Sequence, residues 1–287
     1  SCTAPRVQKH APPRLCANAT YRRTLATINS MSEQICIWCR KRSPEVSFSK
    51  LAHTIPISLG GNEICSNVCD SCNHFFGSPK PNLPAIETVV KEAFNITRMR
   101  LLDPAKDIGK NKPISHPKSI YFEINLKKKK LSIKPSFRLK PGFQSILCRQ
   151  FKRGLYKIFL EETERQKQNG LEDKFNFIRE FSRYNLGDYP VIYFPRTYGA
   201  MLLLQEDIIH PKLHLEPVMK YHIVGYNFFE FELFGHLFSI PTSSQYLIMW
   251  DKYIKESIIR KSRFFKQPIE INYLTDIDLL LSVMDSK

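Results

Sequence analysis

Two pairs of cysteines constrain this chain more than any other feature of its sequence. Cys36 and Cys39 form one C-x2-C pair, and Cys69 and Cys72 form the other. Each pair can place two thiolates on one turn, and two such turns complete a tetrahedral four-sulfur site for zinc. We therefore predict a structural Zn²⁺ ion held by these four thiolates. Two disulfides are the competing arrangement, but C-x2-C pairs in a chain that is not exported are more often metal ligands or redox motifs.

The remaining cysteines do not have the spacing of ligands. We expect Cys65 and Cys148 to be ordinary buried thiols. A thioredoxin-like redox role would need one C-x2-C pair within a βαβ unit, and this sequence has two pairs without that pattern. The zinc site therefore remains the favoured interpretation.

The segment between the two pairs predicts a small unit of two strands and one helix. Strands over 51–57 and 64–68 would be joined by a turn at Gly60 and Gly61, because glycine adopts positive φ without strain. A helix would then start near Asn73. So small a ββα unit buries too little apolar area to hold itself, and zinc would supply the missing stability.

The residues of this unit also form a recognisable pattern. The pattern is His53-x-x-Pro56, then Gly60-Gly61, then Cys69-x-x-Cys72 followed directly by Asn73 and His74. Over residues 36–78 it resembles the HNH endonucleases, the zinc-stapled branch of the His-Me finger (ββα-metal) nucleases. A lone histidine would be weak evidence, whereas a histidine enclosed by two zinc-binding turns is specific.

The resemblance implies hydrolysis of phosphodiester bonds, with His53 as the general base and Asn73 where the last metal-binding His or Asn falls. The reaction needs a base to activate water and a cation to stabilise charge on the leaving oxygen. Histidine exchanges a proton near neutral pH, and the carboxamide oxygen of Asn73 suits Mg²⁺ or Mn²⁺. The middle Asn of the motif, which holds the loop carrying the base, is either Asn62 or Asn67. We favour Asn62, because Asn67 is two residues from a zinc thiolate.

One position departs from the family pattern. Many members carry Asp, Glu or His immediately before the base, where the side chain binds the catalytic metal, and this chain has Ala52. The cation would then be held by Asn73 and phosphate oxygens of the substrate, with assistance from His74 or Asp70. A weakened or inactive nuclease is the alternative. Trp38, within the first cysteine pair, is expected to pack on the fold rather than on a base.

Basic charge is concentrated in one part of the chain. The formal net charge is +16, and residues 101–153 contain fourteen Lys and Arg against three acids. Such an excess favours polyanionic partners, and we predict DNA. A hairpin over 121–137 with a tip at Lys127–Lys130 and a helix over 146–168 would contact the phosphate backbone. The helix face that we expect to be exposed includes Arg149, Lys152, Arg153 and Lys157. A solvated surface rich in lysine is the alternative.

The fold predicted for the whole chain is α+β. A small zinc-stapled ββα-metal (HNH) domain precedes a larger mixed α+β domain with a mostly antiparallel sheet. The first predicted part is a flexible leader over 1–30, for which the two interpretations are a non-native extension and a basic arm that contacts DNA. The HNH nuclease domain follows over 31–78, and a DNA-contacting linker, helix and basic hairpin over 79–153. The last part is an α+β domain for recognition, sensing or dimerisation over 154–287. Further helices are predicted over 85–102, 175–184 and 250–260, and further strands over 191–194, 201–204, 218–224, 228–234 and 237–240.

Two functional hypotheses fit these observations. The first is a metal-dependent DNA endonuclease with a role in restriction or phage defence. The second is a non-catalytic, zinc-stabilised nucleic-acid-binding protein. We favour the nuclease, because a zinc unit that only binds has no use for a base between its halves. We expect a cytoplasmic protein without a membrane span, with a homodimer or a regulatory protein as further partners.

Residues beyond 100 carry no catalytic pattern that we identify. We expect Asp276 and Asp278 to be solvated, and the histidines of this region to be structural.

Overall fold

The computed structural model describes residues 34–102, 119–125, 128, 130–198, 205–216 and 223–285. The leader expected over 1–30, the strand expected over 201–204 and most of the strand expected over 218–224 lie outside these residues. Contacts divide the chain after Gln34, and the unit from Ile35 to Lys287 contains the three other predicted parts except for the first four residues of the predicted HNH domain.

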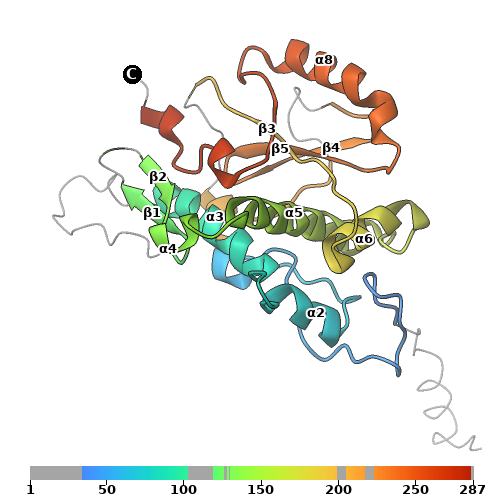
Figure 1. The fold of residues 1–287 in the computed structure, drawn as a ribbon. Coiled ribbons are helices and arrows are strands. Elements are labelled where there is room, and N and C mark those ends of the chain that lie inside the picture. The colour runs from blue at the N-terminus through green and yellow to red at the C-terminus, as the bar shows by residue number, and fades with distance from the viewer. Residues whose placement is uncertain are drawn as a thin grey trace, which may run out of the picture. The chain divides into compact units, whose positions relative to one another are not determined.

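The long helix α5, Phe143–Lys167, runs through the middle of this unit. The larger sheet lies on one side of α5, and the cysteine-rich segment with helix α2, Asp70–Gly77, lies on the other (Figure 1). On the sheet side, the rings of Phe159 and Phe229 lie 4.9 Å apart. Most of α5 is therefore buried, and the predicted HNH segment shares one hydrophobic core with the rest of the unit.

Helix α3, Ile86–Leu101, packs along α5. The two helices approach closely at Gly154, where an added Cβ would lie only 2.2 Å from Cγ2 of Val90. The helix predicted over 85–102 is thus confirmed, and it brings its first turn beside α2.

The exposed face predicted for α5 is wrong. Lys152, Arg153 and Lys157 are only 5%, 2% and 1% exposed. The prediction assumed one solvated face, but the sheet and the cysteine-rich segment cover opposite sides of this helix. Lys152 forms an ion pair with Asp188 at 2.9 Å, and the half-buried Arg149 contacts the same carboxylate at 3.2 Å. These cations therefore stabilise the fold and do not form a DNA-binding surface.

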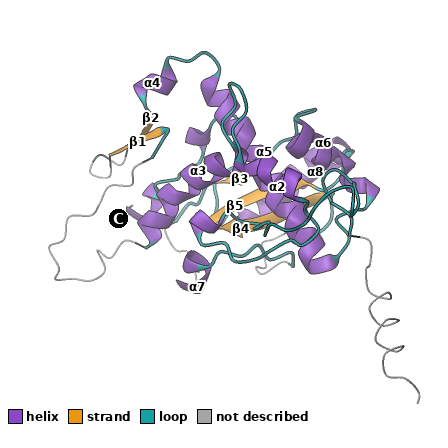
Figure 2. Ribbon diagram, turned by 90° about the horizontal axis from the view of Figure 1, so that it is seen from below, coloured by secondary structure: helices purple, strands orange, loops and turns teal. Residues whose placement is uncertain are grey.

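Four strands form the larger sheet, in the order β4-β5-β3-β6 with antiparallel neighbours throughout. They are β3, Ile192–Phe194, β4, Phe228–Leu233, β5, His236–Pro241, and β6, Ile269–Glu270. Phe234 and Gly235, both at positive φ, join β4 to β5 in a tight hairpin. The mostly antiparallel sheet predicted from the sequence is confirmed, and Figure 2 shows its strands in orange among the helices.

A separate two-stranded hairpin consists of β1, Phe122–Asn125, and β2, Lys130–Ile133. The sequence predicted this hairpin but extended its second strand to residue 137. The strand stops earlier because Pro135 begins the short helix α4, Pro135–Arg138, where its fixed φ suits the first helical turn.

Two further predicted helices are confirmed as α6, Asn176–Tyr184, and α8, Trp250–Lys261. The remaining described elements are short: α7, Gln205–Ile209, and 3-10 turns at Ile57–Leu59, Asp173–Phe175, Tyr246–Met249, Leu274–Asp276 and Ser282–Asp285.

One histidine of the larger sheet is deeply buried, which makes stability depend on pH. His236 is 1% exposed, and its Nε2 lies 2.8 Å from Oγ1 of Thr97. Burial lowers the pKa of His236 to about 3, whereas histidine in an unfolded chain titrates at about 6.5. The unfolded state therefore binds the extra proton between these two values, and acid favours unfolding.

Above pH 6.5 we expect His236 to leave the free energy of unfolding unchanged with pH. Below pH 6.5 the free energy of unfolding should fall because of this residue, by up to about 1.4 kcal/mol per pH unit. Urea unfolding at pH 7.5, 6.5 and 5.5 measures the slope. His236→Gln should be less stable at pH 7.5 but should have a shallower slope between 6.5 and 5.5. An unchanged slope in that variant would show that His236 is not the group responsible.

Candidate active site and metal centre

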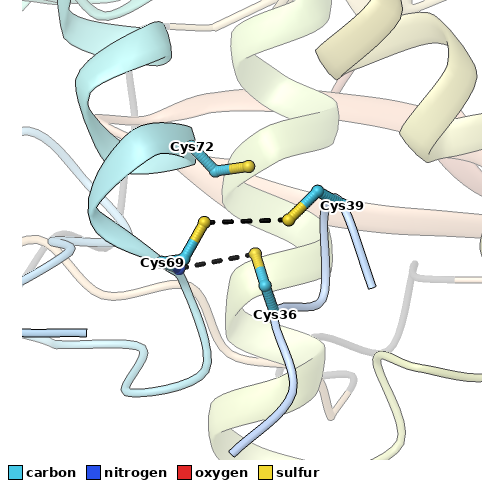
Figure 3. Close-up of side chains that lie close together, drawn as sticks. All are labelled: Cys36, Cys39, Cys69 and Cys72. Carbon is cyan, nitrogen blue, oxygen red and sulfur yellow. Dashed lines mark hydrogen bonds between the residues drawn. The ribbon is translucent and has the colours of Figure 1, made fainter. Parts of the chain in front are cut away.

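The four predicted cysteines lie together in the structure. The sulfur atoms of Cys36, Cys39, Cys69 and Cys72 all lie within 4.8 Å of one another (Figure 3). The Sγ atoms of Cys39 and Cys69 are 3.7 Å apart, close to the separation of about 3.8 Å that tetrahedral Zn–S bonds of about 2.3 Å would give. All four are free thiols, which excludes the disulfide arrangement here. The donor set and its spacing fit a structural zinc ion.

Local structure explains how the two pairs meet. Cys69 is the N-cap residue of α2, and Cys72 lies in the first turn of that helix. The backbone N–H of Cys69 donates to Sγ of Cys36 at 3.4 Å, and the N–H of Ile37 donates to the carbonyl of Asn67 at 2.9 Å. These bonds fasten the first cysteine pair to the start of the helix.

One cation, Arg183, contacts this cluster. Nε of Arg183 donates to Sγ of Cys72 at 3.5 Å, and the guanidinium lies 3.9 Å from the ring centroid of Phe75. A hydrogen bond from Cys72, together with donation from the Cys69 backbone, lowers the pKa of the Cys36 thiol to about 5. The same hydrogen bond raises the pKa of Cys72, and burial raises that of Cys39 to about 11. Among these three cysteines, Cys36 is therefore the one whose surroundings favour thiolate, the form of cysteine that binds metal.

The loop that carries His53 is less regular than predicted. His53 and Ile64 form one isolated antiparallel bridge in place of the strands expected over 51–57 and 64–68. The strand prediction is wrong because Pro56 lacks an N–H and leads directly into the 3-10 turn Ile57–Leu59. The turn after it is as expected, since Gly60 has φ of +92°. A Cβ on Gly61 would lie 2.0 Å from the carbonyl oxygen of Ile55.

His53 and Asn73 line the same hollow, a cavity of about 230 Å³. Asn73 lies in the first turn of α2, which begins at Asp70 rather than near Asn73. Its Nδ2 donates to the carbonyl of Leu51 at 3.1 Å and so ties α2 to the loop that carries His53. Nδ1 of His53 is buried and has no hydrogen-bond partner among the described residues. Unpaired buried nitrogen atoms are rare in proteins and call for an explanation, such as a catalytic role.

A buried lysine of α5 fixes the backbone of this loop. Nζ of Lys157 donates to the carbonyl of His53 at 2.7 Å and lies 3.3 Å from that of Thr54. The same nitrogen forms ion pairs with Glu161 at 2.9 Å and with Glu87 at 3.0 Å. Burial opposes the charge on Lys157, but the two carboxylates outweigh it and raise the pKa of Lys157 above its ordinary value. The motif reveals neither Lys157 nor Glu87, because both lie outside it.

The two candidates for the middle Asn lie elsewhere. Nδ2 of Asn62 is 2.9 Å from Nδ1 of His210, and Asn62 does not line the cavity. Nδ2 of Asn67 donates to Oε1 of Glu164 on α5 at 2.5 Å. Asn73 makes the contact with the base-bearing loop that the sequence led us to expect from one of these two residues.

The sequence suggested Asp70 and His74 as additional ligands of the catalytic cation, and the structure describes both. Asp70 accepts hydrogen bonds from the hydroxyls of Ser47 and Ser49, both at 2.7 Å, and these bonds hold its pKa well below the usual range. His74 is exposed and contacts Ser78 at 3.2 Å. Neither residue lines the cavity of His53. Ala52 is 1% exposed, so the position that carries a ligand in many family members points into the core.

Trp38 packs inside the protein, as expected. It is 1% exposed, its ring lies 4.8 Å from that of Phe76, and its Nε1 donates to Oε1 of Glu161 at 3.0 Å.

Comparison with known proteins agrees with this geometry. Residues 36–81 match the HNH endonuclease family. No curated protein and no solved structure matches the chain. The family match confirms the resemblance drawn from the motif and indicates nuclease activity in general, with nucleic acid as the substrate. Among the described residues, no helix has both the length and the apolar character needed to cross a membrane.

Proposed function

We propose that this protein is a metal-dependent DNA endonuclease in which His53 is the general base. The observation that carries the proposal is the shared cavity: His53, with an unpaired Nδ1, lies beside Asn73 next to a four-cysteine cluster that fits zinc. A protein that only bound nucleic acid would have no use for a half-buried imidazole whose Nδ1 is buried and unpaired in such a hollow.

Each side chain would have a defined task. His53 would take the proton of the water that attacks phosphorus, and Lys157 would keep the His53 backbone in place through its bond to the carbonyl. Because Nδ2 of Asn73 is engaged by Leu51, its Oδ1 remains available as a hard ligand. A divalent cation, Mg²⁺ or Mn²⁺, would stabilise the negative charge that develops on the phosphate.

The wider role belongs to the same proposal. The basic hairpin β1–β2, with exposed Lys128 and Lys130 at its tip, supports contact with a phosphate backbone. A nuclease unit joined to a large further region suits restriction or defence against phage, with residues 154–287 serving recognition, sensing or dimerisation. A regulatory protein would restrain an activity that is toxic to its host.

We expect His53→Ala to lower the rate of Mg²⁺-dependent plasmid nicking by at least about 100-fold, because general-base catalysis contributes on the order of 10² to 10⁴. Supercoiled plasmid, with product resolved on agarose gels over time, gives the rate. Linear duplex, single-stranded DNA and RNA in parallel identify the substrate.

His214→Ala is the matched control, since His214 is exposed and does not line the cavity. It should cut at the wild-type rate. Equal rates for wild type and His53→Ala would remove His53 from the reaction. Binding without cutting by the wild type would favour the non-catalytic alternative.

A further inference from the structure

We infer that Glu87, on α3, supplies the acidic metal ligand that the HNH segment itself lacks, an inference that rests on the proposed nuclease function. The position before the base is Ala52, and its side chain is buried in the core. Among the described residues that line the cavity with His53 and Asn73, Glu87 is the one carboxylate. The acid would thus come from outside the matched segment, residues 36–81.

The fold explains how Glu87 reaches this cavity. After α2 the chain passes through a proline-containing linker and enters α3, with Glu87 in its first turn. The first turn of α3 lies against the last residue of α2, since a Cβ on Gly77 would be 3.4 Å from Oε2 of Glu87. Glu87 lies outside the motif in sequence but lines the same cavity as Asn73.

The two oxygens of Glu87 have different surroundings. Oε1 is 3.0 Å from Nζ of Lys157, a fully buried cation that fixes this side of the carboxylate. No described residue donates a hydrogen bond to Oε2, and the side chain is 25% exposed. Glu87 is thus anchored through one oxygen and open to a ligand through the other.

Lys157 couples Glu87 to the base. Its ammonium contacts the carbonyl of His53 and the carboxylate of Glu87 together, at 2.7 and 3.0 Å. Movement of Glu87 and movement of the His53 backbone are therefore linked through one buried atom. A carboxylate from Glu87 and a carboxamide oxygen from Asn73 are hard oxygen donors of the kind that Mg²⁺ prefers.

Charge in the cavity fits the same assignment. Lys91, one turn after Glu87 on α3, is the described cation that lines the cavity. No ion pair joins it to Glu87, and it is available to a phosphate of the substrate. The cavity therefore offers the carboxylate of Glu87 to a metal cation and the ammonium of Lys91 to a phosphate of the substrate.

The test measures metal binding without requiring catalysis. Full-length, zinc-loaded His53→Ala protein is mixed with Mn²⁺ and a DNA duplex, which it should not cut, and free Mn²⁺ is measured by electron paramagnetic resonance. We expect Glu87→Gln in this background to weaken Mn²⁺ binding by on the order of tenfold or more. With intact His53, the Mg²⁺ concentration for half-maximal nicking should rise by a similar factor.

Glu63→Gln is the matched control. The Glu63 side chain is 24% exposed and pairs with Arg165 and Lys212, but it does not line the cavity. It should bind Mn²⁺ as the parent does. Glu87→Asp, which keeps the charge opposite Lys157 but shortens the reach, should fold and still bind Mn²⁺ more weakly, so that a folding defect of Glu87→Gln does not decide the outcome.

Unchanged Mn²⁺ affinity in folded Glu87→Gln and Glu87→Asp would overturn the inference. The two proposals fail separately. Nicking that depends on His53 but not on Glu87 would refute Glu87 as a metal ligand and leave the proposed nuclease function standing. If the wild-type protein cuts nothing but its Mn²⁺ binding depends on Glu87, the nuclease function is refuted and Glu87 still stands as a metal ligand.

Discussion

Cys69→Ser is expected to release the zinc ion and to destabilise the protein by several kcal/mol, because structural zinc contributes roughly 10 kcal/mol or more in the smallest metal-dependent units. The segment around the cluster has little regular structure of its own, namely two isolated bridges, one 3-10 turn and α2. Serine is a favoured N-cap residue, so this substitution leaves the start of α2 intact and isolates the loss of the metal ligand.

Elemental analysis gives the zinc content, and urea unfolding followed by circular dichroism gives the stability. Cys148→Ala is the control, since Cys148 is a buried thiol outside the cluster. It should lose little more than the packing of one sulfur atom and should keep one zinc per chain. A wild-type protein that contains no tightly held zinc, or Cys69→Ser protein as stable as wild type, would contradict the structural role of the metal.

The parts of the fold that the sequence predicts well are those with a local signal. The sequence pattern predicted β3, β4 and β5 of the larger sheet, but not the two-residue strand β6, and it predicted the helices α3, α6 and α8. The cysteine spacing likewise anticipated a cluster whose members lie within 4.8 Å. In each case the residues that decide the structure are near one another in the chain or belong to a known spacing.

The two strand errors have local causes at Pro56 and Pro135, whereas the error in α5 arises because distant segments decide the structure. Lys157 and Arg153 look like exposed cations on an amphipathic helix, yet each is buried by segments far away in sequence. Arg153 donates to the carbonyls of Phe181 and Ser182. Neither contact has a pattern within α5 from which it could be inferred.

The candidate site divides in the same way. The motif named His53 and Asn73, and the structure places both at one cavity. It did not name Glu87, because the short linker between α2 and α3 determines which residue of α3 faces the cavity. Ala52 was the one indication in the sequence that, in the proposed metal site, an acidic ligand would come from another position.

The second prediction with a large expected effect concerns the buried Lys157. We expect Lys157→Met to lower the free energy of unfolding by about 3 to 5 kcal/mol, since removing one partner leaves a buried charge uncompensated. Glu161 is 0% exposed, and burial already raises its pKa to about 7 even with the lysine present. Without the lysine, the folded state would hold Glu161 still more firmly in its protonated form.

The pH dependence of this loss identifies its cause. A carboxyl group whose pKa is higher in the folded state stabilises the fold fully below its unfolded value of about 4.3, and this stability is lost as the pH rises through the folded value. The loss caused by Lys157→Met should therefore be larger at pH 8 than at pH 5.5, by urea unfolding. Adding Glu161→Gln should recover part of it, as a double-mutant cycle would show.

Lys152→Met is the comparison that separates an uncompensated buried charge from the loss of a buried lysine side chain. Lys152 is also buried, but its partner Asp188 is 63% exposed, so water can solvate that carboxylate when the lysine is removed. We expect a smaller loss for Lys152→Met, with little change between pH 5.5 and 8. Equal losses of unfolding free energy in the two variants would mean that packing of the Lys157 side chain, rather than its charge, stabilises the fold. A larger, pH-dependent loss at Lys157 would instead support the view that one buried ammonium holds the loop of the base, Glu87 and the zinc-bearing segment on α5.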